Sequence, residues 1–320
     1  MTFNEHLTRF YGLPVYDIDE DRQEGVPLPE AGAAAWRVAT SSWDGDDEEC
    51  WAVAFARFLK AVDPAGVRAL IVGCWGPSYD TDAGGPLDAI VAAADRLTSL
   101  EAVFVGDVVV EESEVSWINL CDMSPLLTAY PGLRELGVRG GDTLEFTAIR
   151  HEALASLTIE TGGLPRGPLR AVLDSELPAL ERLDLWLGVS AYGGDVELAD
   201  LQPLLSGGAF PELRHLGLRN SEIQDEIAAA LAGAPVVAQL RTLDLSLGTL
   251  GDAGAAALLA GQPLTHLERL DLHHHFLSEA MEERVREALE PHGVEVDLSG
   301  RETPWGEPWA GDGMYTMVSE

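Results

Sequence analysis

The stretch from residue 240 to 272 reads LRTLDLSLGTLGDAGAAALLAGQPLTHLERLDL, and it sets the fold expected for the whole chain. One spaced triplet of leucines occurs twice in it, 27 residues apart, as Leu240, Leu243, Leu245 and as Leu267, Leu270, Leu272. An alanine-rich segment lies between the two triplets and ends at Gly261. A motif of this kind at a fixed period is typical of a repeat array, in which each unit packs on its neighbours.

The same apolar triplet can be followed through most of the chain. Its eight copies begin at Val67, Leu100, Leu133, Leu154, Leu180, Leu213, Leu240 and Leu267. Each triplet directs its apolar side chains to one face of a short strand, and the residues between them to the other face. A final strand is expected at 294–298, after the last copy.

A helix is expected after most of these strands. The helical segments are 86–97, 169–175, 198–205, 223–231, 252–259 and 278–289. Gly233 and Gly261 follow two of them, where a left-handed residue is commonly found. Strand–helix units at this spacing predict an α/β solenoid, with a curved parallel sheet inside and helices outside.

The two ends of the chain depart from this pattern. Residues 1–65 are expected to form an N-terminal cap, in which strands at 13–18 and 35–40 pair as a hairpin. The acidic run 44–49 should begin a helix that continues through 50–59. Residues 66–299 are assigned to the solenoid and 300–320 to a C-terminal tail with a short strand at 314–318. The tail is expected to cap the last unit, to dock a partner or to fold onto the concave face.

The triplets and the segment 243–261 resemble leucine-rich repeat proteins, and the longer units resemble the ribonuclease-inhibitor-like subtype. The chain is also similar to uncharacterised bacterial leucine-rich repeat proteins of this length. That family usually places Asn or Cys three residues after the second strand leucine. Here the corresponding residues are Trp75, Val108, Gly141, Gly162, Gly188, Ser221, Gly248 and His275, so other groups must satisfy the backbone of the turns.

Composition narrows the possible partners. The chain has 54 acidic and 20 basic residues, a formal charge of −34. This charge disfavours nucleic acid and anionic membranes, and it would suit a protein partner with a basic patch. The three cysteines are far apart, and neither a signal peptide nor a membrane-spanning segment is visible, so a cytoplasmic protein is expected.

No catalytic motif stands out, and neither a cofactor nor a metal is expected. Three adjacent histidines, 273–275, alternate between faces if they lie on a strand and so cannot easily converge on one ion. His273 should then face the concave side, and His275 should lie in the turn. The acidic run 44–49 lacks the spacing of a calcium-binding loop.

The candidate binding residues are those that the strands direct away from the helices. They are Phe104, Arg139, Glu160, Arg182, Asp184, Trp186, His215, Arg219, Asp244, Arg269, Asp271 and His273. Repeat proteins commonly recognise partners through such a platform, because neighbouring strands align these side chains. An exposed Trp186 would suit an interface hot spot, whereas a buried Trp186 would pack against the next repeat.

The resemblance therefore implies a non-enzymatic protein-recognition module that uses its concave face. Two alternatives remain open. One is an inhibitor or sequestering protein for a basic enzyme, and the other is an accessory subunit of an enzyme complex. The leucine face of the strands should be core, whereas Asp244, on the opposite face, is expected to contribute little to folding.

Overall fold

The computed structural model describes residues 4–22, 25–41, 50–141, 143–306 and 313–319. The acidic run 44–49 and Trp309 therefore lie outside the described residues. The chain divides into two compact units. We call Met1–Glu160 with Ser175–Leu177 the N-terminal unit, and Thr161–Asp174 with Pro178–Ser319 the C-terminal unit.

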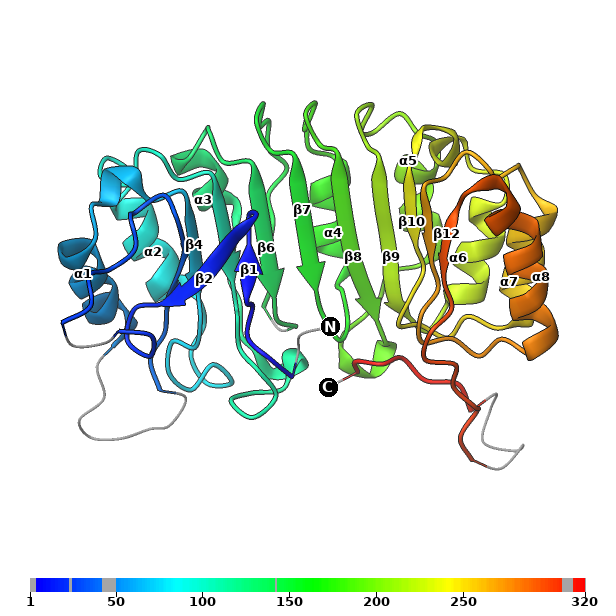
Figure 1. The fold of residues 1–320 in the computed structure, drawn as a ribbon, viewed down its shortest axis with the longest axis horizontal. Helices are drawn as coiled ribbons and strands as arrows, with labels where there is room; N and C mark the ends of the chain where they lie inside the picture. The colour runs from blue at the N-terminus through cyan, green and yellow to red at the C-terminus, as the bar shows by residue number, and fades with distance from the viewer. Residues whose placement is uncertain (1–3, 23–24, 42–49, 142, 307–312, 320) are drawn as a thin grey trace. The chain divides into compact units, whose positions relative to one another are not determined.

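In the N-terminal unit the strands pair in chain order, and all pairs after the first are parallel (Figure 1). The strands are β1 (Arg9–Phe10), β2 (Leu13–Asp17), β3 (Ala35–Val38), β4 (Ala69–Val72), β5 (Ala102–Val105), β6 (Glu135–Arg139) and β7 (Ser156–Glu160). The helices are α1 (Trp51–Ala61), α2 (Gly84–Ala92) and α3 (Ser124–Ala129), which pack in that order.

The C-terminal unit follows the same plan, with strands paired in parallel and in chain order. Its strands are β8 (Arg182–Gly188), β9 (His215–Ser221), β10 (Thr242–Asp244), β11 (Arg269–Asp271) and β12 (Glu295–Asp297). Its helices are α4 (Arg166–Leu173), α5 (Gln202–Leu205), α6 (Gln224–Leu231), α7 (Asp252–Ala260) and α8 (Glu279–Leu289). Strand and helix alternate through the C-terminal unit and from β3 to β6 in the N-terminal unit, so each is a solenoid-like α/β structure.

The predicted strand register is confirmed. Leu243 pairs with Leu216 on one side and with Leu270 on the other, and all three side chains are fully buried. In the N-terminal unit, Leu70 and Val103 are paired and buried in the same way. The triplets therefore form the core between sheet and helices, as expected from their spacing of two residues along each strand.

The hairpin predicted in the N-terminal cap is wrong. Strand β2 pairs with β3 in parallel, with Tyr16 opposite Trp36, so β3 and α1 continue the strand–helix pattern. The hairpin lies earlier, between β1 and β2. Its two turn residues, Tyr11 and Gly12, have φ values of 51° and 71°, the left-handed geometry that a tight two-residue hairpin turn requires.

The N-terminal segment covers one face of its own sheet. Phe10 packs edge-on against Phe104 of β5, with ring centroids 5.9 Å apart. Both belong to an apolar cluster with Ala69, Ile71 and other residues that point away from the helices, and Figure 1 shows β1 lying across this face. Both faces of β4 and β5 are therefore buried, which explains why the sequences ALIV and AVFV do not alternate with polar residues.

A buried histidine closes one of the turns that lack the asparagine usual in leucine-rich repeat proteins. The His275 ring accepts a hydrogen bond at Nδ1 from the Leu277 backbone N–H, and its Nε2 lies 3.1 Å from the Leu298 carbonyl oxygen. This neutral imidazole therefore satisfies one donor and one acceptor of the chain. His275 thus takes the turn position that the sequence predicted.

Neither Gly233 nor Gly261 has the left-handed conformation predicted for it. Gly261 has φ −84° and ψ −142°. A Cβ at Gly261 would lie 2.2 Å from the carbonyl oxygen of Ala232, so close backbone approach, rather than φ, is what requires glycine there. Around Gly233, by contrast, an added Cβ would meet nothing within 4 Å.

Residues 313–319, the last described part of the tail, form no strand, contrary to the expectation for 314–318. They run along turns of the C-terminal unit, where Val318 contacts Asn220, Met317 contacts Leu247 and Tyr315 contacts His274. The tail therefore contacts turns of three successive repeats. Among the described residues, no helix is long and apolar enough to cross a membrane.

Candidate functional site

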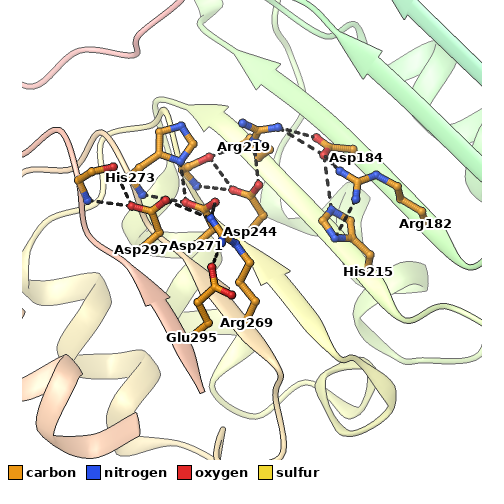
Figure 2. Close-up of polar contacts among 12 residues, drawn as sticks. Arg182, Asp184, His215, Arg219, Asp244, Arg269, Asp271, His273, Glu295 and Asp297 are labelled. Atoms are coloured by element: carbon orange, nitrogen blue, oxygen red, sulfur yellow. Dashed lines mark hydrogen bonds and ion pairs between the residues drawn. The ribbon is translucent and has the colours of Figure 1, made fainter. Parts of the chain in front are cut away.

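Charged side chains fill the face of the C-terminal sheet that points away from the helices (Figure 2). The strand register aligns them in rows. In one row Arg182, His215, Thr242, Arg269 and Glu295 lie opposite one another in turn. In the next row the aligned residues are Asp184, Gly217, Asp244, Asp271 and Asp297. We call these two rows, with Trp186, Arg219 and His273, the charged face.

Three aspartates of the charged face also close the ends of their strands. The Oδ1 atom of Asp244 accepts hydrogen bonds from the N–H and hydroxyl of Ser246, at 3.0 and 2.6 Å. Asp297 accepts the same pair of bonds from Ser299. Asp271 accepts bonds from the backbone and ring nitrogens of His273, at 3.1 and 2.6 Å. One oxygen of each carboxylate is thus used structurally, and the other takes part in ion pairs.

Asp184 is the most buried acid of the charged face, with 1% of its side chain exposed. Arg182 lies 2.9 Å from it, Arg219 3.4 Å and the His215 ring 3.5 Å. Burial alone would raise the pKa of Asp184, but Arg219, His215 and Arg182 outweigh that effect and lower it to about 2. Asp184 is therefore ionised at neutral pH and holds three side chains in place.

A glycine makes room for this cluster. Gly217 lies between Asp184 and Asp244 in the row, and an added Cβ would lie 2.9 Å from the Asp184 carboxyl carbon. The same Cβ would lie 3.2 Å from Cδ of Arg219. Because residue 217 has no side chain, Arg219 can reach Asp184 on one side and Asp244, at 3.2 Å, on the other.

Asp244 differs from its neighbours. Burial is the largest cause that raises its pKa; Arg219 opposes this effect, and the charges of Asp184 and Asp271 add to it. The pKa of Asp271 is lowered instead, because hydrogen bonds from His273 and Arg269 outweigh the effect of burial. The pKa values of these two neighbouring carboxyl groups are therefore shifted in opposite directions.

A second arginine links the last two strands. Arg269 contacts Asp271 at 2.8 Å and Asp297 at 3.0 Å, and it also pairs with Glu295. Glu295 is 66% exposed in its side chain, Arg182 45% and Arg269 34%. These three residues are the parts of the charged face that a partner can reach most directly.

Two sets of side chains bring three metal-ligand atoms within 4.8 Å of one another, namely Asp184, His215, Asp244 and Asp271, His273, Asp297. The aspartates of both sets already form ion pairs with a guanidinium group: Arg219 pairs with the first set and Arg269 with the second. These ion pairs compensate the negative charge of the clustered carboxylates, so the clustering does not require a metal. The three adjacent histidines do not converge, since His274 contacts the tail and His275 lies in its turn.

No family model and no curated protein matches the chain. Among solved structures, the crystal structure of a protein from Bacteroides fragilis, a structural-genomics target, matches with a TM-score of 0.76 and 31% sequence identity. The match covers 83% of this chain and 73% of that one. The chain belongs to the same family as this Bacteroides protein. The description of the Bacteroides relative names no activity, ligand or partner. The relative therefore supports the fold, and a function has to be argued from the geometry of the site.

The structure places nine of the twelve predicted binding residues in the C-terminal unit and three in the N-terminal unit. The nine are Arg182, Asp184, Trp186, His215, Arg219, Asp244, Arg269, Asp271 and His273. Trp186 is only 1% exposed and lies under the Arg219 guanidinium, 5.6 Å from the ring centroid, so the reading of an exposed hot spot is wrong. Asp244 is also buried and hydrogen-bonded, and its small contribution to folding stays a prediction.

Of the three predicted residues of the N-terminal unit, Phe104 and Arg139 are buried, and Glu160 keeps 15% of its side chain exposed. Phe104 is covered by the N-terminal segment, as described above. Arg139 is fully buried and lies 2.7 Å from Glu160 and 3.9 Å from Asp107. Strand alternation gave the correct face for all three, but it carries no information on what covers that face.

One buried ionic cluster was missed by the sequence analysis. Asp107 accepts a hydrogen bond from Arg37 Nε at 2.9 Å and another from the Leu7 backbone at 3.1 Å. Arg37 also contacts Asp17 at 2.6 Å, and His6 lies 3.4 Å from Asp107. This cluster fastens the N-terminal segment to the sheet. Its partners are up to 100 residues apart, and no local motif in the sequence marks them.

Proposed function

We propose that this chain is a leucine-rich repeat protein of the ribonuclease-inhibitor-like subtype that binds a protein partner, without catalysis, through the charged face. The observation that carries the proposal is the difference between the two units. In the N-terminal sheet an apolar cluster covers the outward face of β3, β4 and β5, whereas the C-terminal sheet presents aligned charged side chains on all of its strands. A surface of this kind suits recognition of a complementary protein.

The balance of charge favours a basic partner. Asp184, Asp244, Asp271, Glu295 and Asp297 outnumber the three arginines of the charged face, and the chain as a whole carries a formal charge of −34. Such a field speeds association with a positively charged protein and weakens as salt is added. A cytoplasmic inhibitor or sequestering protein for a basic enzyme is the second candidate, because it needs the same excess of acid.

The test is affinity capture from native cell extract with three forms of the chain. Glu295→Lys reverses an exposed charge on the charged face, and Glu287→Lys makes the same change on the exposed surface of α8. We expect a partner to be retained by the wild type and by Glu287→Lys, and retained at least fivefold less by Glu295→Lys. Retention should also fall as salt is raised from about 50 to 300 mM.

Equal retention by all three forms would place the interface away from the charged face and overturn the proposal. Under the inhibitor alternative, the captured protein is a basic enzyme whose activity falls when the chain is added.

A further inference from the structure

Three equivalent positions, one near the end of β9 and one just after each of β10 and β11, share an uncommon backbone conformation. Asn220, Leu247 and His274 have φ values of 52°, 68° and 53° and are spaced 27 residues apart. Residues other than glycine rarely adopt this left-handed geometry, which costs roughly 1–3 kcal/mol at each position. Its recurrence at equivalent positions of three successive repeats indicates that the geometry serves a purpose beyond turning the chain.

Each of these three residues forms a hydrogen bond with the main chain of one tail residue. The Asn220 amide donates to the Val318 carbonyl at 2.5 Å and accepts from the Val318 N–H at 3.0 Å. The Leu247 carbonyl accepts from the Met317 N–H at 2.8 Å. The His274 ring bonds to the Tyr315 carbonyl at 3.2 Å. On the side of the tail, all four bonds are made by main-chain groups, so they do not depend on its side chains.

Side chains of the tail add a pattern of alternate burial. Thr316 and Val318 are 5% and 3% exposed, whereas Tyr315 and Met317 are about 40% exposed. The Tyr315 ring lies edge-on to Phe276, with centroids 5.3 Å apart. Backbone bonds combined with pockets for alternate side chains are the mode by which proteins commonly bind extended peptides.

We propose that Asn220, Leu247, His274 and Phe276 form a binding site for an extended peptide segment of another protein, with small β-branched side chains at alternate positions. The chain's own tail occupies this peptide site and acts as an intramolecular competitor. A tethered segment has an effective concentration in the millimolar range, so an external peptide gains access when the tail is displaced. The peptide site lies at the end of β9 and in the turns after β10 and β11, and it shares no residue with the charged face.

The first experiment displaces the tail from the peptide site in the full chain by two substitutions, and we call this variant the unseated chain. Met317→Pro removes the N–H that donates to Leu247, and Val318→Asp places a charge at a buried position. A fluorescein-labelled peptide GMYTMVS, which copies 313–319, is then titrated by fluorescence anisotropy. We expect saturable binding to the Met317→Pro/Val318→Asp chain and at least tenfold weaker binding to the wild type, whose peptide site is occupied.

Two controls identify the site. Adding Asn220→Ala to the unseated chain should weaken peptide binding at least tenfold, and the peptide GMYTMDS should not bind. Circular dichroism and the thermal midpoint show whether the sheet remains folded in each variant. Equal binding to wild-type and unseated chains, or binding unaffected by Asn220→Ala, would overturn the proposal.

A second experiment needs no variant. Hydrogen exchange is followed at the Met317 and Val318 amides of the wild-type chain while GMYTMVS is added to saturation. Displacement of the tail should speed exchange at both amides, and GMYTMDS should leave the rates unchanged. If GMYTMVS has no effect at any concentration, external peptides do not enter this site.

Discussion

Asp244 of β10 lies directly opposite Asp271 of β11, and the charge of Asp271 adds to the burial that raises the pKa of Asp244. We therefore expect Asp271→Asn to lower the pKa of Asp244. Carboxyl carbon chemical shifts followed by NMR against pH would measure the change. Glu287→Gln, on the exposed side of α8, removes one negative charge elsewhere and serves as the control. A pKa of Asp244 that stays the same in both variants would show that the two carboxylates do not interact.

The register of the sheet predicts unequal effects for neighbouring residues of β10. Leu243 is fully buried between sheet and helices, so Leu243→Ala should lower the free energy of unfolding by about 2–5 kcal/mol. Thr242 points to the other face and is only half-buried, so Thr242→Ala should cost less than about 1 kcal/mol. Urea denaturation compares the two. Equal losses would mean that the strand faces have been assigned wrongly.

Replacing glycines by alanine tests whether the Asp184 cluster requires residue 217 to lack a side chain. Gly217→Ala places a Cβ 2.9 Å from the Asp184 carboxyl carbon and should destabilise the chain by about 1–3 kcal/mol. Gly233→Ala meets nothing within 4 Å and should be neutral or slightly stabilising. The readout is again the free energy of unfolding in urea. If Gly217→Ala proves as harmless as Gly233→Ala, the Asp184 cluster has more room than the structure shows.

Because His275 is buried, we expect the folded chain to lose stability in mild acid. Burial is the main cause that lowers its pKa below 6.5, and protonation would also break the bond that Nδ1 accepts from Leu277. Between the folded pKa and 6.5 the unfolded chain binds more protons than the folded one, so stability falls as pH decreases through this window.

Thermal unfolding from pH 7 to 5 measures this dependence, which should be shallower in His275→Gln than in the wild type. His292→Gln changes an exposed histidine and should keep the wild-type slope. If His275→Gln kept the same slope, the acid sensitivity would originate elsewhere.

The sequence predicted those parts of the fold that depend on local periodicity. Leucines two residues apart on each strand and helices after them recur along the chain, so the strand faces and most helix positions could be derived. What covers a face could not be derived. Phe104 is buried by Phe10, a partner 94 residues earlier, and Trp186 by a guanidinium from the next strand.

The peptide site escaped the sequence analysis for a related reason. Asn220 and Val318 are 98 residues apart, and their bonds involve the backbone of the tail, which has no characteristic side chain. The 27-residue spacing of Asn220, Leu247 and His274 was present in the sequence. However, their chemical types differ, so only the shared backbone conformation reveals that they are equivalent.

The number of strands in the C-terminal sheet sets how wide a partner's footprint on the charged face can be. The two rows of the charged face extend over the five strands β8–β12. At about 4.8 Å between neighbouring strands, these rows span roughly 19 Å, a width that about three and a half turns of an α-helix would fill. A ligand that engages the charged face across the strands is therefore expected to be a single short helix or loop of its protein.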